Sequence, residues 1–113
     1  MEDKKGSGME VVDLGTVIAT RVITGRKDTE QRYLVKLGIP KQMPGFSDYY
    51  CPVQIEGAFD DEISYSCGID AVQAIQLAMK FLGGRLDRLN QESGGNLRWE
   101  GDEAGNLGFP LPV

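Results

Sequence analysis

The chain of 113 residues contains no histidine and only two cysteines, Cys51 and Cys67. Histidine is the commonest general base and zinc ligand, so its absence removes Ser-His and Cys-His nucleophile pairs and most zinc sites. Two cysteines without a CxxC spacing cannot supply four thiolates to one metal ion. We therefore expect a protein that is not an enzyme, with no catalytic residues, no cofactor and no metal.

Long apolar runs and an excess of basic residues are also lacking. No stretch approaches the roughly 20 apolar residues of a membrane-spanning helix. There are 12 lysines and arginines against 17 aspartates and glutamates, a net charge of −5. Nucleic-acid-binding proteins show a basic face instead. We expect neither a membrane nor a nucleic-acid partner, whereas a basic protein partner is compatible with the acidity.

The amino-terminal residues MEDKKGSGME lack the apolar stretch of a secretory signal. Together with the low cysteine content, this predicts a cytoplasmic protein. Because GSG resembles a linker, we interpret residues 1–8 as a disordered terminus or a linker remnant. The remaining residues, 9–113, suit a single α+β domain in length and in their 41% hydrophobic content.

Four segments are rich in β-branched residues or alternate between apolar and polar side chains, as strands do. They span residues 9–24, 31–40, 49–57 and 62–67. Gly15 predicts a bend in the first strand, and Pro40 ends the second. Because the connections are short, we expect an antiparallel four-stranded meander.

The segment CGIDAVQAIQLAMKFLGGRL predicts the long helix of the domain, packed on one face of the sheet. Asp70 is a good amino-terminal cap, and Gln73 completes a pattern that resembles a capping box. Good helix formers follow from Ala71 to Leu82. The glycines at 83–84 indicate a stop, although the apolar spacing continues beyond them and leaves a longer helix open.

The apolar face of this helix is about twice as wide as a helix on a sheet requires, so a second element must cover one flank. The carboxy-terminal tail, or a short hairpin formed by it, could do so with Trp99 and Phe109. Alternatively, Leu77 and Phe81 could form an interface with a partner or a second copy. A ligand pocket between helix and sheet is the third explanation.

Acidic residues cluster in one turn, at Asp60, Asp61 and Glu62. Such runs are usually solvated turns rather than acid/base pairs. If they have a function, we expect them to contact a basic partner.

The two cysteines could face each other across neighbouring strands. If Glu56 pairs with Glu62, the antiparallel register sets Cys51 opposite Cys67 on the core face, within reach of a disulfide. A redox switch and two reduced, buried thiols are both compatible with this register. Pro52 cannot donate to the ladder, and a bulge there would shift the pairing by one residue.

Four stretches together resemble a family of small bacterial proteins known as a domain of unknown function. They are YYCPVQIEG, CGIDAVQAIQLAMKFLGGRL, RWEG and NLGFPLP. The resemblance covers nearly the whole chain beyond Met9 and implies a bacterial, stand-alone α+β domain. It carries over no catalytic residues. The predicted shape is also similar to that of immunity proteins that neutralise toxins, an analogy that does not establish function.

Three functional hypotheses follow. The first is a non-enzymatic domain that acts by protein–protein contact, including self-association, in an immunity- or regulator-like role. The second is a small-ligand-binding module with a pocket lined by Tyr33, Tyr65, Phe81 and Trp99. The third is a thiol redox sensor that uses Cys51 and Cys67.

Overall fold

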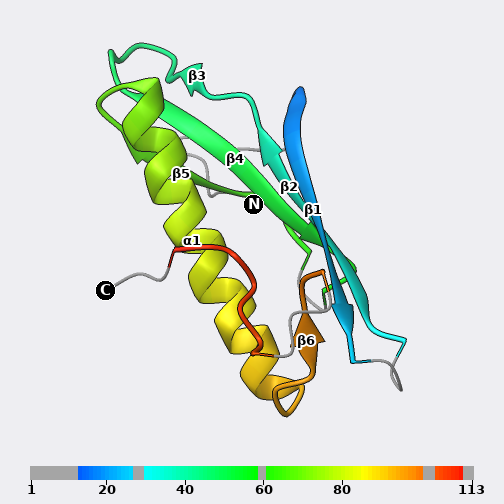
Figure 1. Cartoon of the computed structure of the whole chain (residues 1–113). Coiled ribbons are helices and arrows are strands. Elements are labelled where there is room, and N and C mark those ends of the chain that lie inside the picture. The colour runs from blue at the N-terminus through cyan, green and yellow to red at the C-terminus, as the bar shows by residue number, and fades with distance from the viewer. Residues whose placement is uncertain (1–12, 27–29, 59–60, 101–103, 111–113) are drawn as a thin grey trace, which may run out of the picture.

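The computed structural model describes residues 13–26, 30–58, 61–100 and 104–110. These residues form one antiparallel sheet of six strands with one helix packed on a face of it (Figure 1). The elements are β1 (Val17–Gly25), β2 (Arg32–Gly38), β3 (Lys41–Gln42), β4 (Tyr49–Glu56), β5 (Ser64–Gly68), α1 (Ala71–Glu92) and β6 (Leu97–Arg98). The α+β class is confirmed, but the sheet has six strands rather than four.

The sheet is built around β2 and β4. Strand β2 pairs with β1 on one side and with β4 on the other, and β5 pairs with the far edge of β4. The two additional strands are short: β3 pairs with β4, and β6 pairs with Thr24 and Gly25 of β1. With two residues each, they are too short for an alternating sequence pattern to reveal.

Strand β1 is shorter than the sequence pattern predicts. Residues 9–12 lie outside the described residues, and the strand begins at Val17. Gly15 adopts a left-handed conformation with φ +68°, which only glycine adopts without strain. A register shift between Val17 and Ala19 marks a bulge at the start of the strand. The predicted bend is therefore present, but it precedes the strand.

The core lies between α1 and the side of the sheet that faces it. Its largest fully buried side chains are Ile23, Cys51, Val53, Leu82, Leu86 and Leu97. Burial of each large aliphatic side chain contributes about 1.5–3 kcal/mol. Strand alternation places every second residue of β1, β2 and β4 in this layer.

The predicted capping of α1 is confirmed. The Gln73 N–H donates to Asp70 Oδ1 at 2.8 Å, and the Ile69 N–H donates to Gln73 Oε1 at 2.8 Å. The predicted stop at residues 83–84 is wrong, because the helix continues to Glu92. Gly83 is buried, and a Cβ there would collide with the Pro110 carbonyl oxygen. Glycine is needed because the tail crosses α1 at that point.

The predicted pairing of the cysteines is wrong by one residue. Tyr50 pairs with Cys67, and Cys51 pairs with Ser66. Because side chains alternate along a strand, the two sulfur atoms lie on opposite faces of the sheet, out of reach of a direct disulfide. The prediction rested on a tight turn after Glu56, whereas the connection between β4 and β5 runs from Gly57 to Ile63.

Candidate functional site

Helix α1 packs against β4 and β5 and leaves part of the same face of β1 and β2 uncovered. One hollow occupies this space, and we call it the α1–β1 groove; a second hollow that shares Met79 with it runs along the outer side of α1. A cavity of about 90 Å³ is lined by Ala19, Thr20, Arg21, Val35, Leu37, Met79, Leu82 and Phe109. A wider hollow of about 590 Å³ along α1 is lined by Gln73, Ile75, Gln76, Leu77, Met79, Lys80 and Pro110.

Arg21 anchors the carboxy-terminal tail at one end of this groove. Its Cζ lies 3.9 Å from the centroid of the Trp99 ring and 4.8 Å from that of Phe109. Its Nη1 donates to the carbonyl oxygens of Leu107 at 3.2 Å and Gly108 at 2.9 Å. Cation–π contacts of this kind contribute about 0.5–2 kcal/mol each. The tail therefore bridges β1 and α1, and it closes the groove at Arg21.

The outer edge of β1 borders the groove. The Gly25 N–H donates to Gln31 O at 2.9 Å, toward β2, whereas the Arg26 N–H donates to Asn96 O at 2.7 Å, toward the β6 side. Backbone groups alternate in direction along a strand, so those of Thr20 and Val22 point to the outer edge. Within the part of the chain that the structure describes, β6 pairs only with the last two residues of β1. The outward groups of Thr20 and Val22 therefore have no strand partner there.

The groove is locally basic on an acidic protein. Arg21 lines it, and none of the aspartates or glutamates among the described residues does. The chain as a whole carries a net charge of −5. Lys80 is exposed, and neither it nor Arg21 forms an ion pair with a carboxylate in the ranges 13–26, 30–58, 61–100 and 104–110.

The residues expected to line a ligand pocket do not come together. Tyr65 lies on the face of the sheet opposite α1, with its ring 6.0 Å from that of Tyr50 in a T-shaped contact. Trp99 stacks on Arg21, and Phe81 lies on the other flank of α1, near β4 and β5. Tyr33 packs against the core from β2. A hollow between helix and sheet is present, but other residues line it, because the β5 register turns Tyr65 away.

The residues expected to form an interface are also dispersed. Leu77 is 40% exposed and borders the hollow along the outer side of α1, whereas Phe81 is half-buried. Asp60 lies outside the described residues, and Asp61 and Glu62 are exposed.

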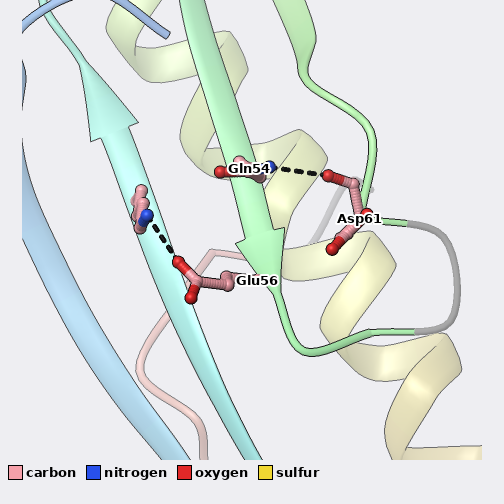
Figure 2. Close-up of polar contacts among 4 residues, drawn as sticks. Gln54, Glu56 and Asp61 are labelled. Atoms are coloured by element: carbon pink, nitrogen blue, oxygen red, sulfur yellow. Dashed lines mark hydrogen bonds and ion pairs between the residues drawn. The ribbon is translucent and has the colours of Figure 1, made fainter.

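Figure 2 shows how the acidic turn is held to β4. Gln54 Nε2 donates to the backbone carbonyl of Asp61 at 2.8 Å, and nearby Glu56 forms an ion pair with Lys36. The bond to Asp61 involves its backbone and not its carboxylate. The turn lies on the β4–β5 side, apart from the groove.

Neither thiol is activated. Burial raises the pKa of Cys51 to about 11, and partial burial together with the Asp48 carboxylate raises the pKa of Cys67. Because the thiolate is the reactive form, both are poor nucleophiles at neutral pH. The described residues contain no group of three or more histidine, cysteine, aspartate or glutamate side chains that could hold a metal ion. No helix among them is long and apolar enough to cross a membrane.

Arg21, Lys80 and the outer edge of β1 were not identified from the sequence. One signal was available: the β1 positions that face α1 read Ala19, Arg21 and Ile23, so a cation interrupts the apolar side of a strand. Its ring partners Trp99 and Phe109 lie far along the chain, and no local pattern connects them to it.

The fold is that of an α+β domain with a groove between a helix and the edge of its sheet, which defines a structural class and not a particular function. Residues 19–111 match the family model DUF6968, a domain of unknown function, and the chain belongs to this family. No curated protein and no solved structure matches the chain. The matched segment includes the groove residues from Ala19 to Phe109.

Proposed function

We propose that this domain is a non-enzymatic protein-binding module that receives an extended segment of a partner along the outer edge of β1. The supporting observation is the position of the outward backbone groups of Thr20 and Val22 beside the α1–β1 groove. In this mode of recognition, main-chain hydrogen bonds supply affinity and pockets for alternate side chains supply specificity.

The groove fits this mode in its geometry. A strand added to β1 would direct alternate side chains to the same side as Ala19 and Arg21, over the apolar surface of Leu37 and Met79. The anchored tail would limit the segment at the Phe109 end. The bound stretch would therefore be short, on the order of four to six residues.

A cytoplasmic immunity- or regulator-like role is the most concrete biological form of this proposal. The domain would cover an extended segment of its partner and thereby block or control it. Once a partner is identified, the partner's activity measured with and without the domain tests this role. Unchanged activity of the fully bound partner would rule the role out.

The test of the binding mode is a proline at the outer edge. Thr20→Pro removes an outward N–H and leaves the hydrogen bonds between β1 and β2 in place, because edge strands accept proline where the N–H faces solvent. Thr20→Ala keeps the N–H and is the matched control. We expect Thr20→Pro to weaken binding of short extended peptides about tenfold or more, with Thr20→Ala close to wild type. Equal affinity of the proline variant would contradict the proposal.

A second candidate function is small-ligand binding. A cavity of about 340 Å³ between α1 and the tail is lined by Gly83, Leu86, Asp87, Asn90, Gly105, Asn106, Leu107 and Phe109. This volume lies within the usual range of ligand sites. Native mass spectrometry of the protein purified from its own host tests this candidate. A small-molecule adduct that the Asn106→Leu variant loses would support it, and protein that carries no adduct would oppose it.

A further inference from the structure

We infer that the cavity between α1 and the carboxy-terminal tail binds a free amino acid with an apolar side chain. This inference rests on the second candidate function, small-ligand binding, because it names the chemical class of the ligand at the same cavity. It depends on three observations: the way in which the tail forms a wall, the hydrogen-bonding groups left over at the rim, and the apolar surface beneath them.

The wall that the tail contributes is held in place by the protein itself. Figure 1 shows the tail, in red, along the carboxy-terminal half of α1. Arg21 holds it from β1 through the carbonyl oxygens of Leu107 and Gly108 and through the Phe109 ring. The Gly108 N–H donates to Asn106 Oδ1 at 2.8 Å, which closes a local turn. Because the wall is formed in advance, a small ligand has little ordering cost to offset.

Three polar side chains at the rim have hydrogen-bonding groups to spare. Asp87 and Asn90 lie three residues apart on one side of α1, and Asn106 lines the same cavity from the tail. Asn90 Oδ1 accepts from the Leu97 N–H at 2.9 Å, and Asn106 Oδ1 is engaged as described above. A backbone N–H requires the oxygen of each amide, so both Nδ2 groups remain as donors. Asp87 Oδ2 accepts from Gln91 Nε2 at 3.0 Å, which leaves Oδ1.

These remaining groups have no competitor within the protein. Among the residues that the structure describes, neither Nδ2 group nor Asp87 Oδ1 has a hydrogen-bond partner, and no lysine or arginine pairs with Asp87. The rim therefore offers two N–H donors and one carboxylate oxygen to a ligand.

A free amino acid complements this arrangement. Its carboxylate accepts from the two asparagine side chains, and its ammonium group donates to Asp87, so each of its charges forms charge-assisted hydrogen bonds. Asp87 and Asn106 are exposed, so both charges of the ligand keep contact with water and avoid the cost of full burial. An anion without an amine would instead meet the Asp87 carboxylate unpaired.

The surface below the rim selects the side chain of the ligand. Leu86 and Gly83 are buried there, and Leu107 and Phe109 close it from the tail. An apolar side chain gains by leaving water on this surface, whereas a charged one loses its hydration without a partner. The cavity of about 340 Å³ accommodates a side chain of the size of leucine.

The experiment uses the full chain and three molecules of similar size: leucine, isocaproate, which lacks the amine, and isoamylamine, which lacks the carboxylate. An NMR titration that follows the side-chain amide signals of Asn90 and Asn106 measures each affinity. We expect leucine to bind about tenfold or more tightly than either analogue, because each analogue loses one set of charge-assisted hydrogen bonds. Lysine should bind more weakly than leucine, because its charged side chain would lie on the apolar surface.

Matched variants test the role of each rim group. Asp87→Asn removes the charge but keeps an oxygen for Gln91, and it should weaken leucine binding about tenfold. Glu92→Gln makes the same change in charge at an exposed position of α1 outside the cavity and should leave the affinity unchanged. Asn106→Asp keeps the acceptor for the Gly108 N–H and replaces the donor by a carboxylate, so it should also weaken leucine binding. Equal affinities of the Asp87→Asn and Glu92→Gln proteins for leucine would overturn the inference.

Other outcomes separate the inference from the candidate function on which it rests. If leucine and isocaproate bind equally at this cavity, the amino-acid inference is wrong and small-ligand binding stands. The same holds if the protein from its own host carries an adduct that is not an amino acid. If none of the three molecules binds and no adduct is present, both are wrong.

Discussion

At the scale of single residues, the two cysteines have different surroundings although they lie on adjacent strands. Cys51 is fully buried and its Sγ lies 3.4 Å from the Gly38 carbonyl oxygen, whereas Cys67 is exposed and its Sγ lies 3.8 Å from Met43 Sδ. The one-residue difference in register therefore separates them chemically. One behaves as a small core residue, and the other is an accessible thiol with a raised pKa.

We predict that a thiol-alkylating reagent modifies Cys67 in the native protein and reaches Cys51 only after unfolding. Asp48→Asn should increase the rate at Cys67, because the Asp48 carboxylate raises the pKa of that thiol. Peptide mapping by mass spectrometry measures both rates. An intramolecular Cys51–Cys67 disulfide in mildly oxidised native protein would show that the register described above is wrong.

The buried thiol also predicts a pH dependence of stability. Burial raises the Cys51 pKa from 9.0 to about 11 in the folded state, so the folded state binds this proton more tightly than the unfolded state does. The contribution of this protonated thiol to the free energy of unfolding is complete below about pH 9. It is lost as the pH rises through about 11, a change on the order of 3 kcal/mol. Urea denaturation should show a steeper alkaline loss for wild type than for Cys51→Ala. Parallel pH profiles of the two proteins would contradict this cause.

Substitution of Arg21 should lower the free energy of unfolding more than substitution of most other partly buried residues. Arg21→Gln removes the cation between Trp99 and Phe109 and disrupts the hydrogen bonds to the tail. We expect a loss of about 1–3 kcal/mol in the free energy of unfolding. Arg88→Gln on the exposed face of α1 is the control and should change it by less than about 0.5 kcal/mol. Equal effects of the two substitutions would mean that the tail is not held through Arg21.

At the scale of elements, contact with the tail explains why α1 has a glycine at position 83 in its interior. Alanine normally stabilises a helix interior by up to about 1 kcal/mol over glycine. Here a Cβ would collide with the Pro110 carbonyl oxygen, so we predict that Gly83→Ala destabilises the protein and displaces the tail. Urea denaturation and amide exchange near Phe109 measure the two effects, with Arg88→Ala as the control. A gain in stability would show that the tail does not cross α1 there.

Elements with strong local signals could be predicted, and elements set by distant contacts could not. The Asp70 cap, the start of α1 and the buried side of β4 follow from local sequence. The helix end could not be predicted, because Gly83 reflects a contact with Pro110 rather than a helix stop. The short strands β3 and β6 carry no periodic pattern, and the β4–β5 register depended on a connection with no characteristic turn.

The residues of the candidate site also divide into those with a local sequence signal and those set by distant contacts. Leu77 was singled out from the sequence, but it borders the hollow on the outer side of α1 and not the α1–β1 groove. Arg21 was not singled out. Its role depends on contacts with the rings of Trp99 and Phe109, which lie far from it in the sequence. Tyr65 was placed in a pocket because the predicted register turned it inward.

At the scale of the whole molecule, β1 is an edge strand that is protected at both ends. A bulge between Val17 and Ala19 disrupts one end, and β6 covers the other. Natural sheets use such devices to prevent uncontrolled pairing of edges. What remains is a short edge beside the α1–β1 groove, which suits a specific extended partner better than an open-ended aggregate.

Amide hydrogen exchange of β1 during titration with a short, blocked, valine-rich peptide tests most directly whether an extended segment binds at this edge. We predict that protection of the Thr20 and Val22 amides rises about tenfold or more at saturation. The Arg21 amide, which alternation directs toward β2, should change little and is the internal control. Unchanged exchange at Thr20 and Val22 with the peptide bound would contradict the account.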